Sequence, residues 1–176
     1  MAEPTLVIVS GAPGSGKTTL AHALARAIGC PAVCRDEIKE GMVHAFGPGF
    51  EAAPGDPLTR RTFDLFFAVI RLLVEGEVSV VAEAAFQHQL WKVQLEPLAD
   101  LARLRIIRCR TEAAVARQRV ANRPRRPAHA DTSVLDHASY YEEFDPVTLA
   151  VPTIDLDTSD GYSPSLDHVL EFVSAE

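Results

Sequence analysis

Near the start of the chain, the stretch GAPGSGKTT (residues 11–19) combines three glycines with a lysine and two threonines. It follows an apolar run, TLVIVS, and precedes an alanine- and leucine-rich segment with helical spacing. This order matches G-x-x-x-x-G-K-[ST], the Walker A pattern, in its required place between a buried strand and a helix. Glycines let successive backbone N–H groups turn inward, and the helix N-terminus adds positive charge, so such a loop binds phosphate groups.

The residues of this loop have distinct expected roles. Lys17 is expected to reach the β- and γ-phosphates of ATP, and the Thr18 hydroxyl to coordinate Mg²⁺. The alternative, a glycine-rich turn that binds no nucleotide, does not explain a lysine and a threonine in this register. ATP and Mg²⁺ are therefore the expected cofactors. The predicted nucleotide-binding residues are Gly11, Ala12, Pro13, Gly14, Ser15, Gly16, Lys17, Thr18 and Thr19.

An acidic pair, Asp36 and Glu37, follows a short apolar segment that reads as a second strand. In open α/β sheets, ligands bind at the carboxyl ends of strands. Asp36 there could accept the proton of an acceptor hydroxyl and help to position Mg²⁺. The alternative is an ordinary helix N-cap at Asp36 with Glu37 in the first turn. Neighbouring Arg35 is a further candidate for contact with the acceptor.

Arginines gather in a later segment of the chain. Arg119 and Arg123 are four residues apart on one predicted helix face, and more arginines follow the proline that ends this helix. Guanidinium groups bind phosphate oxygens well, so these side chains are candidates for contact with the transferring phosphoryl group. The alternative is a solvated basic face. The predicted phosphate-binding arginines are Arg117, Arg119, Arg123 and Arg126.

Two single residues complete the candidate site. Glu83 ends a strand-like run, VSVVAE, and is a candidate for contact with substrate, with a role as general base as the lesser possibility. A carboxylate that caps a helix or anchors a loop is the alternative. His129, in the segment PAHAD, could touch the substrate, although a surface position is the more common role of such a histidine.

The segments that must position these residues alternate between strands and helices. Alternation of this kind indicates a parallel sheet covered on both faces, the doubly wound α/β class. A glycine- and proline-rich loop, 46–57, is expected to form a flap. The expected strands are 5–10, 32–34, 78–82, 104–109 and 153–156. The expected helices are 17–28, 36–44, 58–75, 88–101 with a kink or break at Pro97, 112–122 capped by Thr111, 132–143 and 164–173.

Taken together, these motifs resemble a known group of enzymes. GAPGSGKTT, CRDEIKE, VVAEAAF and the helix that carries the arginines are similar to P-loop kinases related to the 5′-kinase domain of phage polynucleotide kinase. That group includes zeta-toxin-like and chloramphenicol phosphotransferase-like enzymes. The resemblance covers most of the chain in element order, with its specific motifs in the first half and the arginine helix. It implies the P-loop NTP hydrolase fold, Asp36 as catalytic base, and an arginine lid over about residues 117–131 that closes over ATP.

Composition limits the remaining choices. The 176 residues fit one domain, 1–176, and the mean hydropathy of +0.05 fits a substantial core. No run of about 18–20 apolar residues is present and the N-terminus lacks a signal-peptide pattern, so we expect a cytoplasmic protein without a membrane span. Cys30, Cys34 and Cys109 are expected to be buried thiols rather than disulfides. The net charge of −7 disfavours binding to long nucleic acids, although a local basic path remains possible.

The sequence therefore predicts an ATP-dependent phosphotransferase, with the five parallel strands in the order 2-3-1-4-5. A guanine-reading N-K-x-D segment is absent, and the chain is short for a large ATPase motor. The expected partners are ATP and a small hydroxylated acceptor, such as a metabolite, nucleoside or antibiotic. One alternative is a kinase of polynucleotide 5′-hydroxyl groups, and a second is a nucleotide-dependent ATPase or switch without an acceptor.

Overall fold

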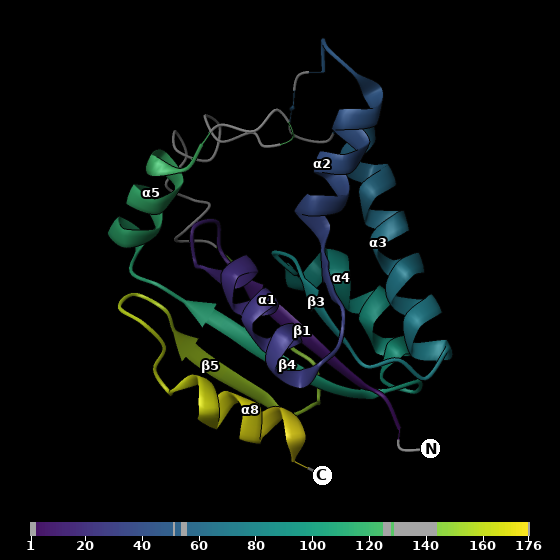
Figure 1. The fold of residues 1–176 in the computed structure, drawn as a ribbon, viewed down its shortest axis with the longest axis vertical. Coiled ribbons are helices and arrows are strands. Elements are labelled where there is room, and N and C mark those ends of the chain that lie inside the picture. Colours follow the sequence, from purple (N-terminus) through teal and green to yellow (C-terminus); the bar gives the residue numbers. More distant parts are fainter. Residues whose placement is uncertain (1–2, 51, 54–55, 125–127, 129–143, 176) are drawn as a thin grey trace.

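The computed structural model describes residues 3–50, 52–53, 56–124, 128 and 144–175. Arg125, Arg126, His129 and the predicted helix 132–143 lie outside these ranges. A parallel five-stranded sheet forms the centre of the molecule (Figure 1). Its order, β2-β3-β1-β4-β5, is the predicted one. The strands are β1 (Thr5–Gly11), β2 (Ala32–Cys34), β3 (Val80–Glu83), β4 (Arg103–Arg110) and β5 (Thr153–Asp157).

Helices pack on both faces of the sheet because successive side chains of a strand point to opposite faces. Leu6 and Ile8 of β1 belong to the core with α3 (Pro57–Glu75) and α4 (His88–Leu95), whereas Val7 and Val9 belong to the core with α1 (Lys17–Ile28) and α8 (Leu166–Ser174). All four side chains are almost fully buried, each contributing roughly 1.5–3 kcal/mol to folding. The other described helices are α2 (Arg35–Phe46), the 3₁₀ helix η1 (Glu96–Leu98) and α5 (Ala113–Asn122).

Two helix ends test the sequence predictions in detail. The break predicted at Pro97 is confirmed, because α4 stops at Leu95 and a 3₁₀ turn contains the proline. The prediction that Thr111 caps the next helix is wrong. Glu112 occupies the N-cap position of α5, and the Thr111 hydroxyl instead shares a short hydrogen bond with the hydroxyl of Thr158, which follows β5.

The three cysteines are free thiols, as expected, with Cys34 and Cys109 buried and Cys30 half-buried. Burial raises the pKa of Cys109 to about 12. Among the described residues, no helix combines the length and apolar character that a membrane span would need. Because all five strands are parallel, their carboxyl ends meet at one edge of the sheet, and this edge carries the predicted site.

Candidate active site

The glycine-rich loop between β1 and α1 closes tightly against its neighbours. Gly14 and Gly16 both have φ of +76°, a left-handed conformation that favours glycine. A Cβ at Gly14 would lie 2.3 Å from the carbonyl oxygen of Ala116 on α5, and a Cβ at Gly11 would lie 2.5 Å from Ser15 Oγ. The loop therefore needs glycine at these positions for backbone conformation and for close approach. α1 begins directly after it, at Lys17.

Lys17, Thr18 and Glu83 meet where β3 ends beside the start of α1. Lys17 Nζ lies 3.7 Å from Glu83 Oε1 and 3.5 Å from the carbonyl oxygen of Ala12, to which it donates a hydrogen bond. The Thr18 hydroxyl donates to Glu83 Oε2 over 3.1 Å. Burial raises the pKa of Glu83 above its ordinary value, although the Lys17 ammonium opposes that effect. Glu83 is 2% exposed and belongs to the site through its contacts with Lys17 and Thr18 rather than by lining the cleft.

This group of side chains suits Mg²⁺ on chemical grounds. Mg²⁺ prefers oxygen ligands and usually keeps several of its waters, so one hydroxyl and a neighbouring carboxylate suffice on the protein side. The Thr18 hydroxyl and the Glu83 carboxylate supply such oxygens at hydrogen-bond distance from each other. Glu83 therefore joins the predicted ligands Thr18 and Asp36 as a residue that could hold the ion or its waters.

Asp36 lies in the first turn of α2, opposite the glycine-rich loop. The helix begins one residue before it, at Arg35, with Cys34 as the N-cap residue, so reading Asp36 as an N-cap is wrong. Arg35 Nη1 donates a hydrogen bond to Asp36 Oδ1 over 2.9 Å. The Asp36 side chain is 46% exposed, which leaves it accessible to a ligand. Glu37 and Glu40 lie on the same helix and line the same cleft.

Arg119 closes the opposite side of the site. Its Nη2 donates to the carbonyl oxygens of Thr158 at 2.7 Å and Ser159 at 3.1 Å, and its Nη1 donates to Gly14 O at 3.4 Å. The Thr158 hydroxyl in turn donates to the carbonyl oxygen of Ser15 over 2.7 Å. α5, the glycine-rich loop and the loop after β5 are thus joined through two side chains.

One cleft of about 740 Å³ runs between these walls. Its lining residues extend from the predicted phosphate loop to the acidic turn of α2, and Figure 1 shows α5 and α2 on opposite sides of α1. Carboxylates lie on the α2 side, while arginines lie on the α5 side. The lining residues are Gly14, Gly16, Lys17, Thr18, Thr19, His22, Asp36, Glu37, Glu40, Arg119, Val120, Arg123, Pro124, Thr158, Gly161 and Tyr162.

The structure brings most of the predicted site residues to this edge of the sheet. Arg119 and Arg123 line the cleft, whereas Arg117, on the same helix, is not among the described residues that line it. Arg126 and His129 lie outside the described residues, so their predicted roles stay predictions.

Sequence reasoning missed several residues of the cleft. His22 follows Thr18 by one helical turn and Glu40 follows Asp36 by one turn, so both could have been found from i,i+4 spacing. Thr158 and Tyr162 come from the loop after β5, where the sequence shows no motif.

Comparison with known proteins identifies the family of this chain. The model of the AAA_33 family, described as an AAA domain, matches residues 6–144. No curated protein matches the sequence.

Solved structures share the whole fold at low sequence identity. A candidate kinase from Chloroflexus aurantiacus is 24% identical, with a TM-score of 0.84 over 98% of this chain and 97% of that one. A sugar kinase from Janibacter is 18% identical, with a TM-score of 0.68 over 98% and 99% of the two chains. The APS kinase of Mycobacterium tuberculosis, solved with AMPPNP and APS, is 14% identical, with a TM-score of 0.67 over 99% and 100%. These likenesses establish the fold.

Proposed function

The chain belongs to the AAA_33 family, and we propose that it transfers the γ-phosphate of ATP to a hydroxyl group of a small molecule. The observation that carries this proposal is the composition of the cleft between α2 and α5. Lys17 and Thr18 line one part of it, and Asp36 lines another part in the same continuous space. A protein that only bound and slowly hydrolysed ATP would not need a second carboxylate-lined region beside the phosphate loop.

The proposed reaction depends on positioning and charge, because phosphoryl transfer has a loose transition state. The glycine-rich loop and Lys17 hold the β- and γ-phosphates, while Asp36 orients the acceptor hydroxyl and accepts its proton. Arg119 and Arg123 supply positive charge from the α5 side to the transferring phosphoryl group. Mg²⁺, held through Thr18 with Asp36 or Glu83, supplies further charge neutralisation when bound.

The acceptor side of the cleft favours a neutral or cationic small molecule. Asp36, Glu37 and Glu40 all line it, and a strand of phosphates would face these three carboxylates. Nucleic acids are bound largely by neutralising phosphates with basic side chains. The acidic wall therefore supports a sugar, polyol, nucleoside or amino-containing antibiotic over a polynucleotide. The sugar kinase from Janibacter, whose fold this chain shares, is in line with this choice.

Release of ADP from ATP and Mg²⁺ tests the proposal with a panel of acceptors. The panel contains sugars, polyols, sugar acids, nucleosides, aminoglycosides and a 5′-hydroxyl oligonucleotide, with Lys17→Ala as the inactive control. We expect at least one small hydroxylated compound to accelerate ADP release and to gain a phosphate by mass spectrometry. Efficient labelling of the oligonucleotide would favour the polynucleotide kinase alternative. Slow hydrolysis that no member of the panel changes would favour the switch alternative.

A further inference from the structure

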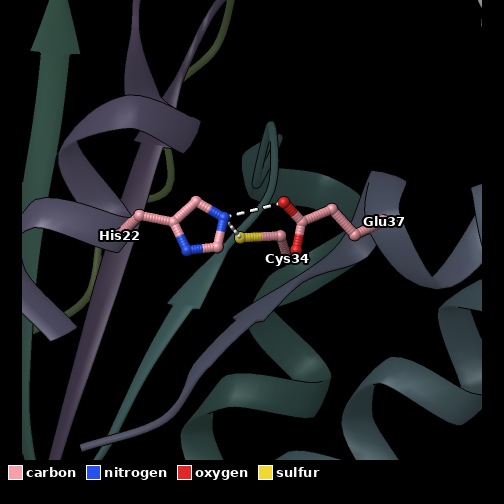
Figure 2. A group of neighbouring side chains, drawn as sticks. All are labelled: His22, Cys34 and Glu37. Carbon is pink, nitrogen blue, oxygen red and sulfur yellow. Dashed lines mark hydrogen bonds and ion pairs between the residues drawn. The ribbon is translucent and has the colours of Figure 1, made fainter. Parts of the chain in front are cut away.

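A histidine, a cysteine and a glutamate meet beside the acceptor end of the cleft. His22 comes from α1, Cys34 from the end of β2 and Glu37 from the first turn of α2. His22 Nε2 lies 2.7 Å from Glu37 Oε1 and 3.8 Å from Cys34 Sγ. Figure 2 shows the imidazole nitrogen directed at the carboxylate oxygen and the sulfur together. One potential ligand atom from each residue lies within 4.8 Å of the other two.

These three ligand atoms match the preferences of a borderline divalent cation. Zn²⁺ binds nitrogen, sulfur and carboxylate oxygen in a tetrahedron, with bond lengths of about 2.0–2.3 Å. Those lengths separate sulfur from nitrogen by about 3.5 Å and nitrogen from oxygen by about 3.3 Å in a tetrahedral site. The observed separations of 3.8 and 2.7 Å differ from these values by well under 1 Å, and the sulfur lies within 4.8 Å of the carboxylate oxygen. Small side-chain rotations would therefore complete three corners of a tetrahedron.

Two of the three side chains line the cleft, and the third is buried. Cys34 is only 2% exposed. His22 and Glu37 are each 44% exposed and line the cleft directly. A metal ion would enter from the cleft and keep one coordination position open to water or to a ligand oxygen there. Three protein ligands with an open position are the arrangement of catalytic rather than structural zinc sites.

We propose that His22, Cys34 and Glu37 form a binding site for Zn²⁺ or a similar borderline metal, separate from the Mg²⁺ that accompanies ATP. The two sites would select different ions because their ligand atoms differ. Mg²⁺ requires hard oxygen ligands such as Thr18 and Glu83, whereas a thiolate and an imidazole favour zinc, cobalt or copper. Since His22 and Glu37 line the same cleft as Asp36, a metal ion bound there would lie beside the acceptor region of the cleft.

Co²⁺ titration of the intact protein without ATP tests this site directly. We expect visible bands of tetrahedral Co²⁺, a near-ultraviolet charge-transfer band from the Cys34 thiolate, and a stoichiometry of one. Added Zn²⁺ should abolish both signals, while a large excess of Mg²⁺ should leave them unchanged. Because ATP and acceptor are absent, this result does not depend on kinase activity.

Matched variants distinguish the site from a simple hydrogen bond between His22 and Glu37. Cys34→Ser should remove the near-ultraviolet band and weaken Zn²⁺ binding at least about tenfold. Cys30→Ser, at a half-buried thiol on the same segment, should retain both, and circular dichroism checks the fold of each variant. The proposal would be overturned if the wild-type protein gave no tetrahedral Co²⁺ spectrum, if Mg²⁺ displaced Co²⁺, or if the band survived in Cys34→Ser.

Discussion

The Thr18 hydroxyl donates a hydrogen bond to Glu83 Oε2 over 3.1 Å, which joins the start of α1 to the end of β3. Glu83 is expected to orient Thr18 and the Mg²⁺ waters only when its carboxylate is ionised. Burial raises the pKa of this carboxyl, so it takes up a proton at higher pH than an ordinary glutamate as the solution is acidified. In the pH profile of kcat/KM, activity should therefore fall on the acid side at a pH above the pKa range of ordinary glutamates.

Glu83→Gln checks this assignment. The amide keeps the size of the side chain but cannot ionise, so we expect kcat to fall by about 10–100-fold, the range for residues that support a metal site. The acid limb assigned to Glu83 should also disappear from the pH profile. A variant with wild-type kcat and the same acid limb would show that this carboxylate is structural.

Asp36→Asn tests the proposed general base. We expect kcat to fall by about 10²–10⁴-fold, with ATP affinity within a few-fold of the wild type. A loss at the lower end of this range would mean that Asp36 mainly orients the hydroxyl, because a loose transition state depends little on early removal of its proton. Steady-state kinetics with the identified acceptor measures both effects. Asp100→Asn is the matched control, because it removes an exposed carboxylate that lies before β4. If Asp36→Asn kept the wild-type kcat, the role of general base would pass to Glu83.

The parts of the fold that the sequence predicts correctly are those indicated by residues close together in the chain. The Walker A loop, α1 and β2 lie where their residues predict them. In this part of the chain the apolar residues have clear periodicity, and glycines mark where the elements begin and end. The carboxyl ends of parallel strands then determine that Lys17, Asp36 and Glu83 share one edge.

The contacts missed from the sequence are those made between distant segments. Thr111 was predicted as a cap because a threonine before a helix usually serves that role. Its actual partner, Thr158, lies 47 residues later in the chain, on the loop after β5. Periodicity cannot reveal such a pair. The same applies to Cys34, which is buried as expected but also contacts His22.

Arg119→Lys tests the role of the α5 arginine. The guanidinium donates to three carbonyl oxygens, from Gly14, Thr158 and Ser159, and one ammonium cannot reproduce that planar geometry. We expect kcat/KM for ATP to fall by about 10–100-fold, equal to a loss of roughly 1.4–2.8 kcal/mol in transition-state stabilisation. Arg26→Lys, on an exposed position near the end of α1, should behave as wild type. Equal kinetics for the two variants would show that the planar guanidinium of Arg119, with its three carbonyl contacts, is not needed for catalysis.

A buried ion pair connects α2 with the start of α3. Lys39 Nζ lies 2.7 Å from Asp56 Oδ2, and the two side chains are 8% and 5% exposed. Asp56→Ala would leave the ammonium buried without its partner, so we expect the free energy of unfolding to fall by about 3–5 kcal/mol. Urea denaturation measures this loss. Replacing both residues, Lys39→Met with Asp56→Ala, should recover part of it, and a double variant as unstable as the single one would contradict the ion-pair explanation.

The same pair predicts how stability depends on pH. Burial alone would raise the pKa of Asp56, but hydrogen bonds from Lys39 and Thr59 outweigh it and hold the pKa below its ordinary value. Because the pKa of Asp56 is lower in the folded state than in the unfolded state, its ionised carboxylate stabilises the fold at pH values above the unfolded-state pKa, near 4. This stabilisation is lost as the pH falls through the folded-state pKa. Asp56→Asn should therefore unfold with a weaker pH dependence than wild type in the acid range. Identical pH dependence would exclude Asp56 as its source.

Gly14→Ala separates two reasons for a glycine in the phosphate loop. Gly14 and Gly29 have similar backbone conformations, with φ of +76° and +80°, so alanine is strained by a similar amount at either position, about 1–2 kcal/mol. Only Gly14 is also crowded, because its new Cβ would lie 2.3 Å from Ala116 O, whereas nothing lies within 4 Å at Gly29. We therefore expect Gly14→Ala to lower the melting temperature more than Gly29→Ala does. It should also weaken ATP binding, because the added methyl group pushes α5 away from the loop, while Gly29→Ala leaves ATP affinity unchanged. Equal losses in the two variants would mean that backbone conformation alone requires glycine here, and that contact with α5 does not shape the nucleotide site.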